Sequence, residues 1–165
     1  ERVWIRTHDD MEVQNGGLRY QTVVLGCKMI YQRGIDEAHQ FAKMAQLPTR
    51  VGCVLSDGRG NTISASFNRK KSHPLQAKYA ALAGMNKKIY LHAEISTIIQ
   101  AMMYSPLSFY HRRSNNAKVA TVVRLGRKGG YRPSKPCLVC LGALEDFGVK
   151  QIIYYNGIEW VEENL

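Results

Sequence analysis

The chain has 165 residues, of which 23 are lysine or arginine and 13 are aspartate or glutamate, so its formal net charge is +10. The length and an apolar fraction of 45% predict one folded domain with its own core and argue against intrinsic disorder. No uncharged apolar run reaches the roughly 18–20 residues that span a bilayer, so we expect no membrane association and a cytoplasmic location. The excess of cations predicts an anionic partner, such as nucleic acid or a nucleotide.

The cations are concentrated in the middle of the chain. Between Asp57 and Glu145 lie 15 lysines and arginines but a single acidic residue, Glu94, which gives this segment a net charge of +14. The rest of the chain holds 8 basic and 12 acidic side chains and is therefore negative, at −4. This distribution favours a positive surface around the site that the central segment builds, and it makes the lone carboxylate of Glu94 a candidate for a specific role.

The first part of the chain, residues 1–34, is predicted to be an N-terminal extension that precedes a domain of residues 35–165. Within it, Asn15–Gly17 indicates a turn and Tyr20–Leu25 has the pattern of a short strand, as in a hairpin or a docking arm. A helix is then expected to begin at Asp36, as its N-cap, and to end before Pro48. Its apolar residues recur at helical spacing: Ala38, Phe41, Ala42 and Ala45.

The remaining elements alternate between strands and helices. Two strands, Val51–Leu55 and Thr62–Phe67, flank a glycine-containing turn and predict a β-hairpin. Residues 69–88 are predicted to be basic and irregular, with a helical piece at 75–82, and residues 126–136 to be a basic loop. Further elements are expected as helices at 92–103 and 137–147, strands at 119–125 and 151–155, and a polar tail after the turn at 156–157. This order predicts an α/β fold, in which helices cover both faces of a mixed sheet with a parallel pair.

Three residues at two predicted helix starts have the chemistry of zinc ligands. His92 opens one helix, while Cys137 and Cys140 lie three residues apart at the start of another, so that both sulfurs can face one point. The positive end of a helix dipole lowers the pKa of a nearby thiol and helps to hold it as a thiolate. Three nitrogen and sulfur ligands are the number that a catalytic zinc site uses while it keeps a fourth position open. We therefore predict one zinc ion per chain.

Glu94 lies two residues after His92, where its carboxylate can reach the open side of such a metal. A carboxylate at this place can take a proton from water and return it to a leaving amine. Glu94 is therefore the predicted catalytic residue.

Two other interpretations of the cysteine pair are open. A C-x-x-C pair can be half of a structural zinc site with a fourth protein ligand, or it can be a redox pair. The candidate fourth ligands are Cys27, Cys53, His73 and His111, and none of them has motif spacing. The combination of both motif halves, each at a helix start, favours the catalytic site.

With His92-Ala93-Glu94 and Pro136-Cys137-Leu138-Val139-Cys140, residues 35–155 resemble the cytidine deaminase-like superfamily, whose signature consists of these two motif halves. That superfamily includes deoxycytidylate deaminases, tRNA adenosine deaminases and DNA cytosine deaminases. The resemblance implies a three-layer α/β/α fold with a mixed central sheet. It also implies zinc-dependent hydrolysis, in which activated water attacks C4 of cytosine or C6 of adenine, ammonia leaves, and Glu94 moves the proton.

The resemblance extends to residues that would contact the substrate. The hairpin that ends at Asn68 is similar to the family's second strand, which implies that Asn68 contacts the base or sugar; a turn-capping role is the alternative. It also implies that the residues beside the motif halves, Ala93, Lys135 and Pro136, position the substrate.

Two further features of the sequence bear on the substrate class. Residues 72–79 look most like deaminases encoded by bacteriophages. Family members specific for deoxycytidylate usually follow the acid with Asn-Ala, whereas this chain has Ile95 and Ser96 there, so it departs from the pattern of monophosphate specificity.

We favour a cytosine deaminase that acts on nucleic acid, preferably DNA, because phosphate neutralisation dominates nucleic-acid affinity. The cations expected to bind it are Arg69, Lys70, Lys71, Arg112, Arg113, Arg127, Lys128 and Arg132. Four aromatic residues lie among or near the cations and can stack on bases, with core packing as the alternative for each: Tyr104, Phe109, Tyr110 and Tyr131. The alternative functions are a deoxycytidylate or cytidine deaminase of nucleotide metabolism, an adenosine deaminase acting on tRNA, and a zinc-stabilised module without catalysis. The sequence leaves the formation of homo-oligomers open.

Overall fold

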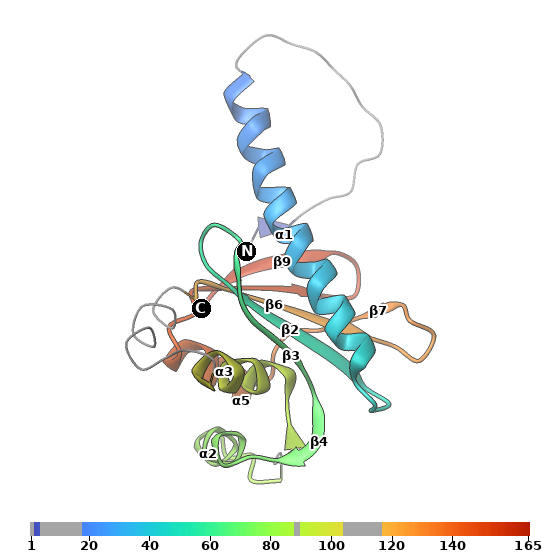
Figure 1. The fold of residues 1–165 in the computed structure, drawn as a ribbon, viewed down its shortest axis with the longest axis vertical. Coiled ribbons are helices and arrows are strands. Elements are labelled where there is room, and N and C mark those ends of the chain that lie inside the picture. Colours follow the sequence, from blue (N-terminus) through green and yellow to red (C-terminus); the bar gives the residue numbers. More distant parts are fainter. Residues whose placement is uncertain (1, 4–17, 88–89, 104–116) are drawn as a thin grey trace.

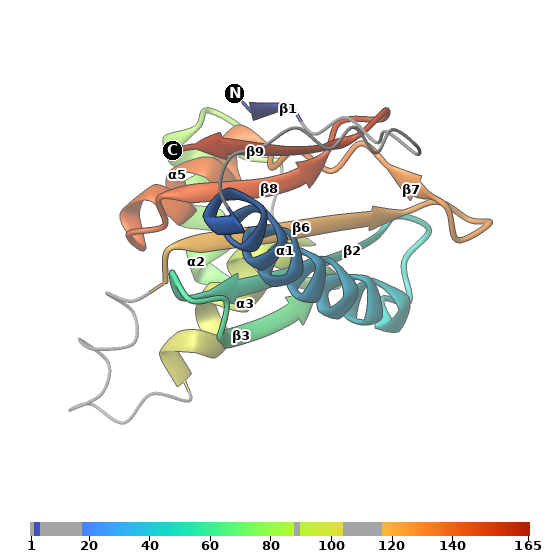
Figure 2. The ribbon, with the colours of Figure 1, turned by 90° about the horizontal axis from the view of Figure 1, so that it is seen from above.

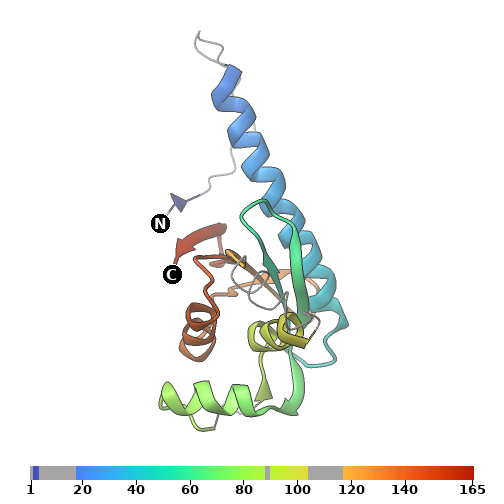
Figure 3. The same cartoon turned by 60° about the vertical axis from the view of Figure 1, so that its left-hand side comes forward.

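A computed structural model describes residues 2–3, 18–87, 90–103 and 117–165, with side chains from residue 31 onward. Figure 1 shows a central mixed β-sheet with helices on both faces. The predicted three-layer architecture is confirmed, since α1 (Leu18–Met44) covers one face while α3 (Ala93–Met103) and α5 (Leu138–Asp146) cover the other. The helix α2 (Pro74–Leu82) packs on α5 on the side away from the sheet (Figure 3).

The main sheet has the strand order β1-β9-β8-β6-β2-β3, and β7 pairs with the end of β6. Its strands are β1 (Arg2–Val3), β2 (Arg50–Ser56), β3 (Thr62–Phe67), β6 (Val119–Leu125), β7 (Tyr131–Arg132), β8 (Gln151–Tyr155) and β9 (Trp160–Asn164). The parallel pair expected late in the chain is β6 and β8, which α5 connects. The other described pairs of this sheet are antiparallel, including the predicted hairpin of β2 and β3.

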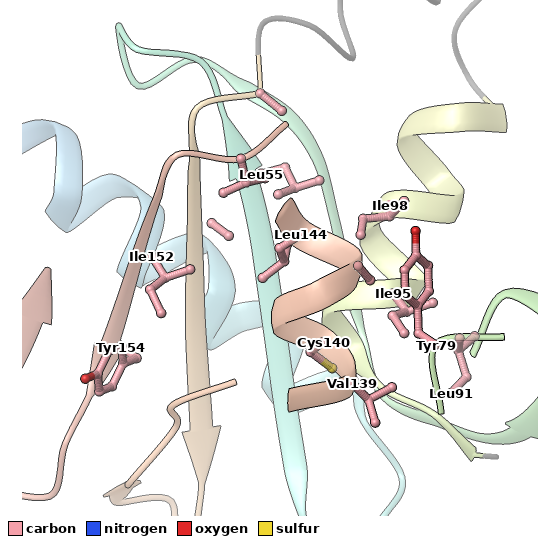
Figure 4. Packing of buried hydrophobic residues seen from close by; sticks show 14 of the residues in the cluster. Leu55, Tyr79, Leu91, Ile95, Ile98, Val139, Cys140, Leu144, Ile152 and Tyr154 are labelled. Carbon is pink, nitrogen blue, oxygen red and sulfur yellow. The ribbon is translucent and has the colours of Figure 1, made fainter. Parts of the chain in front are cut away.

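The core has two halves because successive residues of a strand face opposite sides of the sheet. On β6, Val123 and Leu125 pack beneath α1, whereas Ala120 belongs to the cluster on the side of α3 and α5. Figure 4 shows this second cluster, in which Leu144 and Ile95 project between α5, α3 and the strands. The helices that carry the zinc motif are therefore fixed by apolar packing.

Helix α1 packs against β2 (Figure 2), and its backbone lies close to that of the strand at Gly52. A Cβ atom on Gly52 would be 2.0 Å from the carbonyl oxygen of Ala38 and 2.6 Å from the backbone nitrogen of Ala42. Helix backbone atoms cannot move aside as a flexible side chain can, so only glycine allows this approach. Ala38 and Ala42 are both fully buried there.

The N-terminal prediction was wrong in two details. Residues 20–25 are helical and not a strand, and Asp36 lies inside α1, where it accepts a hydrogen bond from Gln32 Nε2 at 2.8 Å. β-branched residues lower helix propensity only slightly, and no proline interrupts residues 18–44, so the helix continues through them. The predicted turn at 15–17 lies outside the described residues. The division of the chain into 1–34 and 35–165 remains a prediction, and α1 runs across it without a break.

Three predicted irregular segments contain strands. The polar tail forms β9, which pairs with β8 through a turn in which the side chain of Asn156 accepts hydrogen bonds from two backbone N–H groups. The basic loop contains β7, and the segment before His92 contains a small second sheet of β4 (Arg69–Ser72) and β5 (Tyr90–Leu91). Their sequences are polar or very short, so partner strands and not local propensity determine them.

Among the described helices, none combines the length and apolar character that a membrane span requires.

Candidate active site

The side chains of His92, Cys137 and Cys140 meet at one point between the starts of α3 and α5. Nδ1 of His92 lies 3.3 Å from Sγ of Cys140 and 3.5 Å from Sγ of Cys137, and the two sulfurs are 3.8 Å apart. For a tetrahedral zinc ion at its usual bond lengths, these separations are about 3.6 Å between nitrogen and sulfur and about 3.8 Å between sulfurs. The three donor atoms therefore have the spacing and the chemistry that zinc requires.

The backbone explains why these side chains converge. His92 and Cys137 each occupy the position before the first helical residue, and their carbonyl oxygens accept hydrogen bonds from Ser96 and Leu141, at 2.9 Å in both cases. Cys140 lies in the first turn of α5 and is buried in the apolar cluster below it (Figure 4). Two helix N-termini thus point at the ligand atoms and favour negatively charged sulfur.

The thiols are prepared for metal binding. The hydrogen bond with Cys140 lowers the pKa of Cys137 to about 3, and the neighbouring imidazole of His92 acts in the same direction. The same contact and burial raise the pKa of Cys140. The thiolate form of Cys137 is therefore favoured before zinc binds, and zinc binding would displace the proton of the Cys140 thiol.

The cluster contains three protein ligands within the part of the chain that the structure describes. Of the four candidate fourth ligands, Cys53 is buried on β2, and His73 caps α2 by accepting a hydrogen bond from the backbone of Leu75 at 3.1 Å. The side chain of Cys27 and all of His111 lie outside the described residues. Three ligands and an open position are the arrangement of catalytic zinc sites.

Glu94 is 5% exposed, which is exceptional for a carboxylate. Burial raises its pKa above the usual value, while the proximity of His92 opposes this shift. Desolvation is the larger of the two effects. A buried carboxyl group with a raised pKa binds a proton more readily than an exposed one, which suits a group that transfers protons.

A pocket of about 370 Å³ opens beside the three ligands. Ala93, Val51 and Val122 supply apolar surface to its wall, which also includes Glu94, His92 and Cys137. The volume is at the lower end of the range for small-molecule sites, which is roughly 300–1,000 Å³. The pocket therefore has room for a small aromatic ring beside the metal ligands.

Asn68 lines this pocket directly after β3. Its Oδ1 accepts a hydrogen bond from the backbone of Val51 at 2.9 Å, and its Nδ2 donates to the carbonyl of Thr49 at 2.8 Å. These bonds fix the amide in the wall and leave it one further N–H donor. The predicted contact of Asn68 with substrate stays a prediction.

The other predicted substrate residues are distributed around the pocket. Ala93 and Lys135 line it, whereas Pro136 is buried and does not belong to the lining. The ammonium group of Lys135 is bound by both carboxylate oxygens of Glu163, at 2.7 and 3.0 Å. Its charge is thereby partly neutralised.

The predicted nucleic-acid residues are mostly exposed side chains. Arg69 lines the pocket, with its guanidinium 4.8 Å from the ring centre of Phe67. The exposed residues are Lys70 and Lys71 on β4, Arg127 and Lys128 in the turn after β6, and Arg132 on β7. Residues 104–116 are outside the described part, and with them Tyr104, Phe109, Tyr110, Arg112 and Arg113. Tyr131 packs against His39, Tyr155 and Trp160, so packing accounts for it.

Sequence reasoning assigned no role in the site to Arg124, which lines the pocket, or to Gln76, which contacts His92. Arg124 is exposed, lines the pocket and pairs across strands with Arg132. Arg124 lies near the end of a buried strand within the basic segment, and this position could have indicated its role from the sequence. Gln76 lies fully buried on α2, and its side chain contacts the backbone of His92. No pattern in the sequence indicates that contact.

The fold and the His-Cys-Cys centre define a zinc-dependent α/β/α enzyme domain. The profile of the family described as "Cytidine and deoxycytidylate deaminase zinc-binding region" matches residues 29–156, which is most of the chain. The chain belongs to this family, and it is a zinc-dependent hydrolytic deaminase whose family acts on nucleotides or nucleic acids. A comparison with curated proteins gave no significant match.

Proposed function

We propose that this protein converts cytosine to uracil in nucleic acid, with DNA as the preferred polymer. The observation that carries the proposal is the charge of the pocket. Arg69 and Arg124 line it without an ion-pair partner among the described residues, beside Lys135, which is paired with Glu163. Within the described residues, its only lining carboxylate is that of Glu94. A pocket of this kind attracts a substrate that carries phosphates near the reacting base.

The roles of the protein groups follow from their positions. His92, Cys137 and Cys140 hold the zinc, which when bound supplies Lewis-acid activation of water. Glu94, buried beside these ligands, accepts a proton and delivers it to the amino group that leaves as ammonia. Val51 and Val122 provide apolar surface against which a pyrimidine ring can lie, and the remaining N–H of Asn68 can donate to its carbonyl oxygen or to the sugar.

A second candidate is a deaminase of free deoxycytidylate or cytidine. The pocket volume of about 370 Å³ favours it, since this space suits a single nucleotide. Against it stand the exposed cations outside the pocket, including Lys70 and Lys71, which a monophosphate does not need. An adenosine deaminase acting on tRNA is a third candidate, which shares the same zinc chemistry.

One substrate panel tests the proposal. The zinc-loaded protein is incubated with single- and double-stranded DNA, RNA, free deoxycytidylate and deoxycytidine, and uracil and inosine are quantified. We expect uracil in DNA and none in any substrate with the Glu94→Ala variant. Conversion of deoxycytidylate alone would show that the polymer is not the substrate, and inosine in RNA would support the third candidate.

A further inference from the structure

The small sheet of β4 and β5, here called the β4–β5 ribbon (residues 69–72 and 90–91), forms part of the pocket rim. Arg69, Tyr90 and Leu91 from this ribbon line the pocket together with His92 and Glu94. Arg69 and Leu91 are paired with each other and both line the pocket, whereas Lys70 and Lys71 of the same ribbon are exposed. The ribbon therefore extends from the pocket to the surface. It lies in the segment between Asp57 and Glu94, which contains no acidic residue.

Tyr90 is an aromatic side chain that has no aromatic neighbour among the described residues. It is 56% exposed although it lines the pocket, and its ring makes no ring contact or hydrogen bond with any described residue. Tyr131, the other strongly exposed tyrosine of the described chain, is instead held among His39, Tyr155 and Trp160. A free aromatic face at a pocket rim suits the stacking of a second base.

Two lysines of the ribbon are turned outward by an irregularity in strand pairing. Arg69 pairs with Leu91 and Ser72 with Tyr90, so Lys70 and Lys71 have no residues opposite them. An interruption of this kind re-aims side chains away from the ladder. Both lysines are exposed, and neither makes an ion pair within the described part of the chain.

Arg69 stands between the pocket and the outward lysines. Its Nε is buried, and it has no hydrogen-bond partner among the described residues. A buried N–H donor without an acceptor costs free energy unless a ligand satisfies it. An oxygen of a phosphate at the pocket mouth is a suitable acceptor, because guanidinium groups bind phosphate strongly.

We infer that the β4–β5 ribbon binds the nucleotide next to the target cytosine, with Tyr90 stacked on its base, Arg69 on the connecting phosphate, and Lys70 and Lys71 on the following phosphates. This inference rests on the proposed action on nucleic acid and names the path of the polymer. The pocket accommodates one nucleotide, so the neighbours of the target must lie on the rim. On the rim at Lys135, the cation is already paired with Glu163.

The test compares oligonucleotide and mononucleotide. With Tyr90→Ala we expect the ratio of kcat/KM for a single-stranded deoxyoligonucleotide to kcat/KM for deoxycytidylate to fall about 5- to 150-fold, as loss of one base stack predicts. Tyr90→Phe, which keeps the ring, should retain the wild-type value on both. An equal loss on both substrates, or no loss on the oligonucleotide, would overturn the inference while the proposed function stands. Wild-type protein without activity on any polymer would overturn both.

A binding measurement gives a second readout. The Glu94→Gln variant, which prevents turnover, is titrated with oligonucleotides that carry 2-aminopurine on the 5′ or the 3′ side of the cytosine. Stacking on Tyr90 should quench the fluorescence in one of the two positions, and the additional change Tyr90→Ala should remove the quench. Equal fluorescence with and without the ring would contradict the assigned stack.

The lysines are tested by the salt dependence of binding. Each phosphate contact to a single strand contributes about −0.7 to the slope of log K against log salt, so the double variant Lys70→Gln, Lys71→Gln should reduce the slope by about 1.4. The matched control is Arg59→Gln, Lys150→Gln, because these exposed cations lie at the end of the sheet opposite to the pocket. Equal slopes of log K against log salt in the two double variants would show that the β4–β5 ribbon binds no phosphates.

Discussion

The side-chain carbonyl oxygen of Gln76 accepts a hydrogen bond from the backbone N–H of His92 at 3.1 Å. Gln76 is fully buried on α2, a helix that contributes none of the three zinc ligands. The bond therefore connects the outer helix to the residue that carries the nitrogen ligand. Groups that orient metal ligands commonly affect metal affinity about 10- to 100-fold.

We expect Gln76→Leu to weaken zinc binding by about this factor, because it removes the acceptor that helps to fix the backbone of His92. Competition with a chelator of known affinity measures the effect, and zinc restored in excess should recover most of the activity. Gln100→Leu is the control, since Gln100 on α3 donates a hydrogen bond to Ser66 on β3 and is not in the cluster of zinc ligands. Equal zinc affinities of the two variants would show that Gln76 only supports packing.

Glu94→Gln should abolish turnover while zinc remains bound. General acid–base catalysis contributes about 10²- to 10⁴-fold, so kcat should fall at least into this range. Zinc content should stay at one ion per chain, since Glu94 is not among the three clustered ligands. Glu145→Gln on the exposed side of α5 should leave kcat unchanged. Residual activity within tenfold of wild type would remove Glu94 from the proton transfer.

Zinc removal should destabilise the fold, because the ion joins the starts of α3 and α5. A ligand at 100 times its dissociation constant stabilises the folded state by about 2.7 kcal/mol. We therefore expect the thermal midpoint to fall on chelation and to recover with added zinc. Metal analysis should give one zinc per chain, and the midpoint of Cys140→Ser should respond much less to chelator. Two zinc ions per chain would contradict the single three-ligand centre.

The sequence predicted those elements and ligands that depend on residue spacing within a short segment of the chain. The helix expected at 92–103 is α3, and the two motif halves predicted the three clustered zinc ligands. The missed strands depend on partners, because Trp160–Asn164 has little strand character without β8 beside it. The positions of Tyr90 and Gln76 depend on contacts between segments that are far apart in the chain. A single sequence does not indicate such contacts.

Arg124 should recognise the phosphate of the target nucleotide. It is exposed at the pocket, and no carboxylate pairs with it within the described residues. A hydrogen bond to a charged group contributes about 1.5–3 kcal/mol, so Arg124→Gln should lower kcat/KM for deoxycytidylate about 10- to 150-fold. Activity on deoxycytidine, which lacks the phosphate, should be unchanged, and Arg59→Gln is the control. A parallel loss on deoxycytidine would mean that Arg124 shapes the pocket instead.

The ion pair of Lys135 and Glu163 should stabilise the protein only within a defined pH range. The hydrogen bond from Lys135 lowers the pKa of Glu163, and the same bond raises the pKa of Lys135. The contribution of Glu163 is present above the unfolded pKa of about 4.3 and is lost as the pH falls through its lowered folded value. That of Lys135 is present below about 10.4 and is lost as the pH rises through its raised folded value.

Glu163→Gln should therefore lower the free energy of unfolding near pH 7 by less than about 1 kcal/mol, since the side chain of Lys135 is 48% exposed and the pair is screened by solvent. Urea denaturation of wild type and variant between pH 7 and pH 3 should give curves that converge as Glu163 becomes protonated. Glu145→Gln, on an exposed carboxylate without an ion pair in the described structure, should show no such convergence. A difference that stays constant over this range would mean that the side chain acts through packing and through its bond from Tyr154, not through its charge.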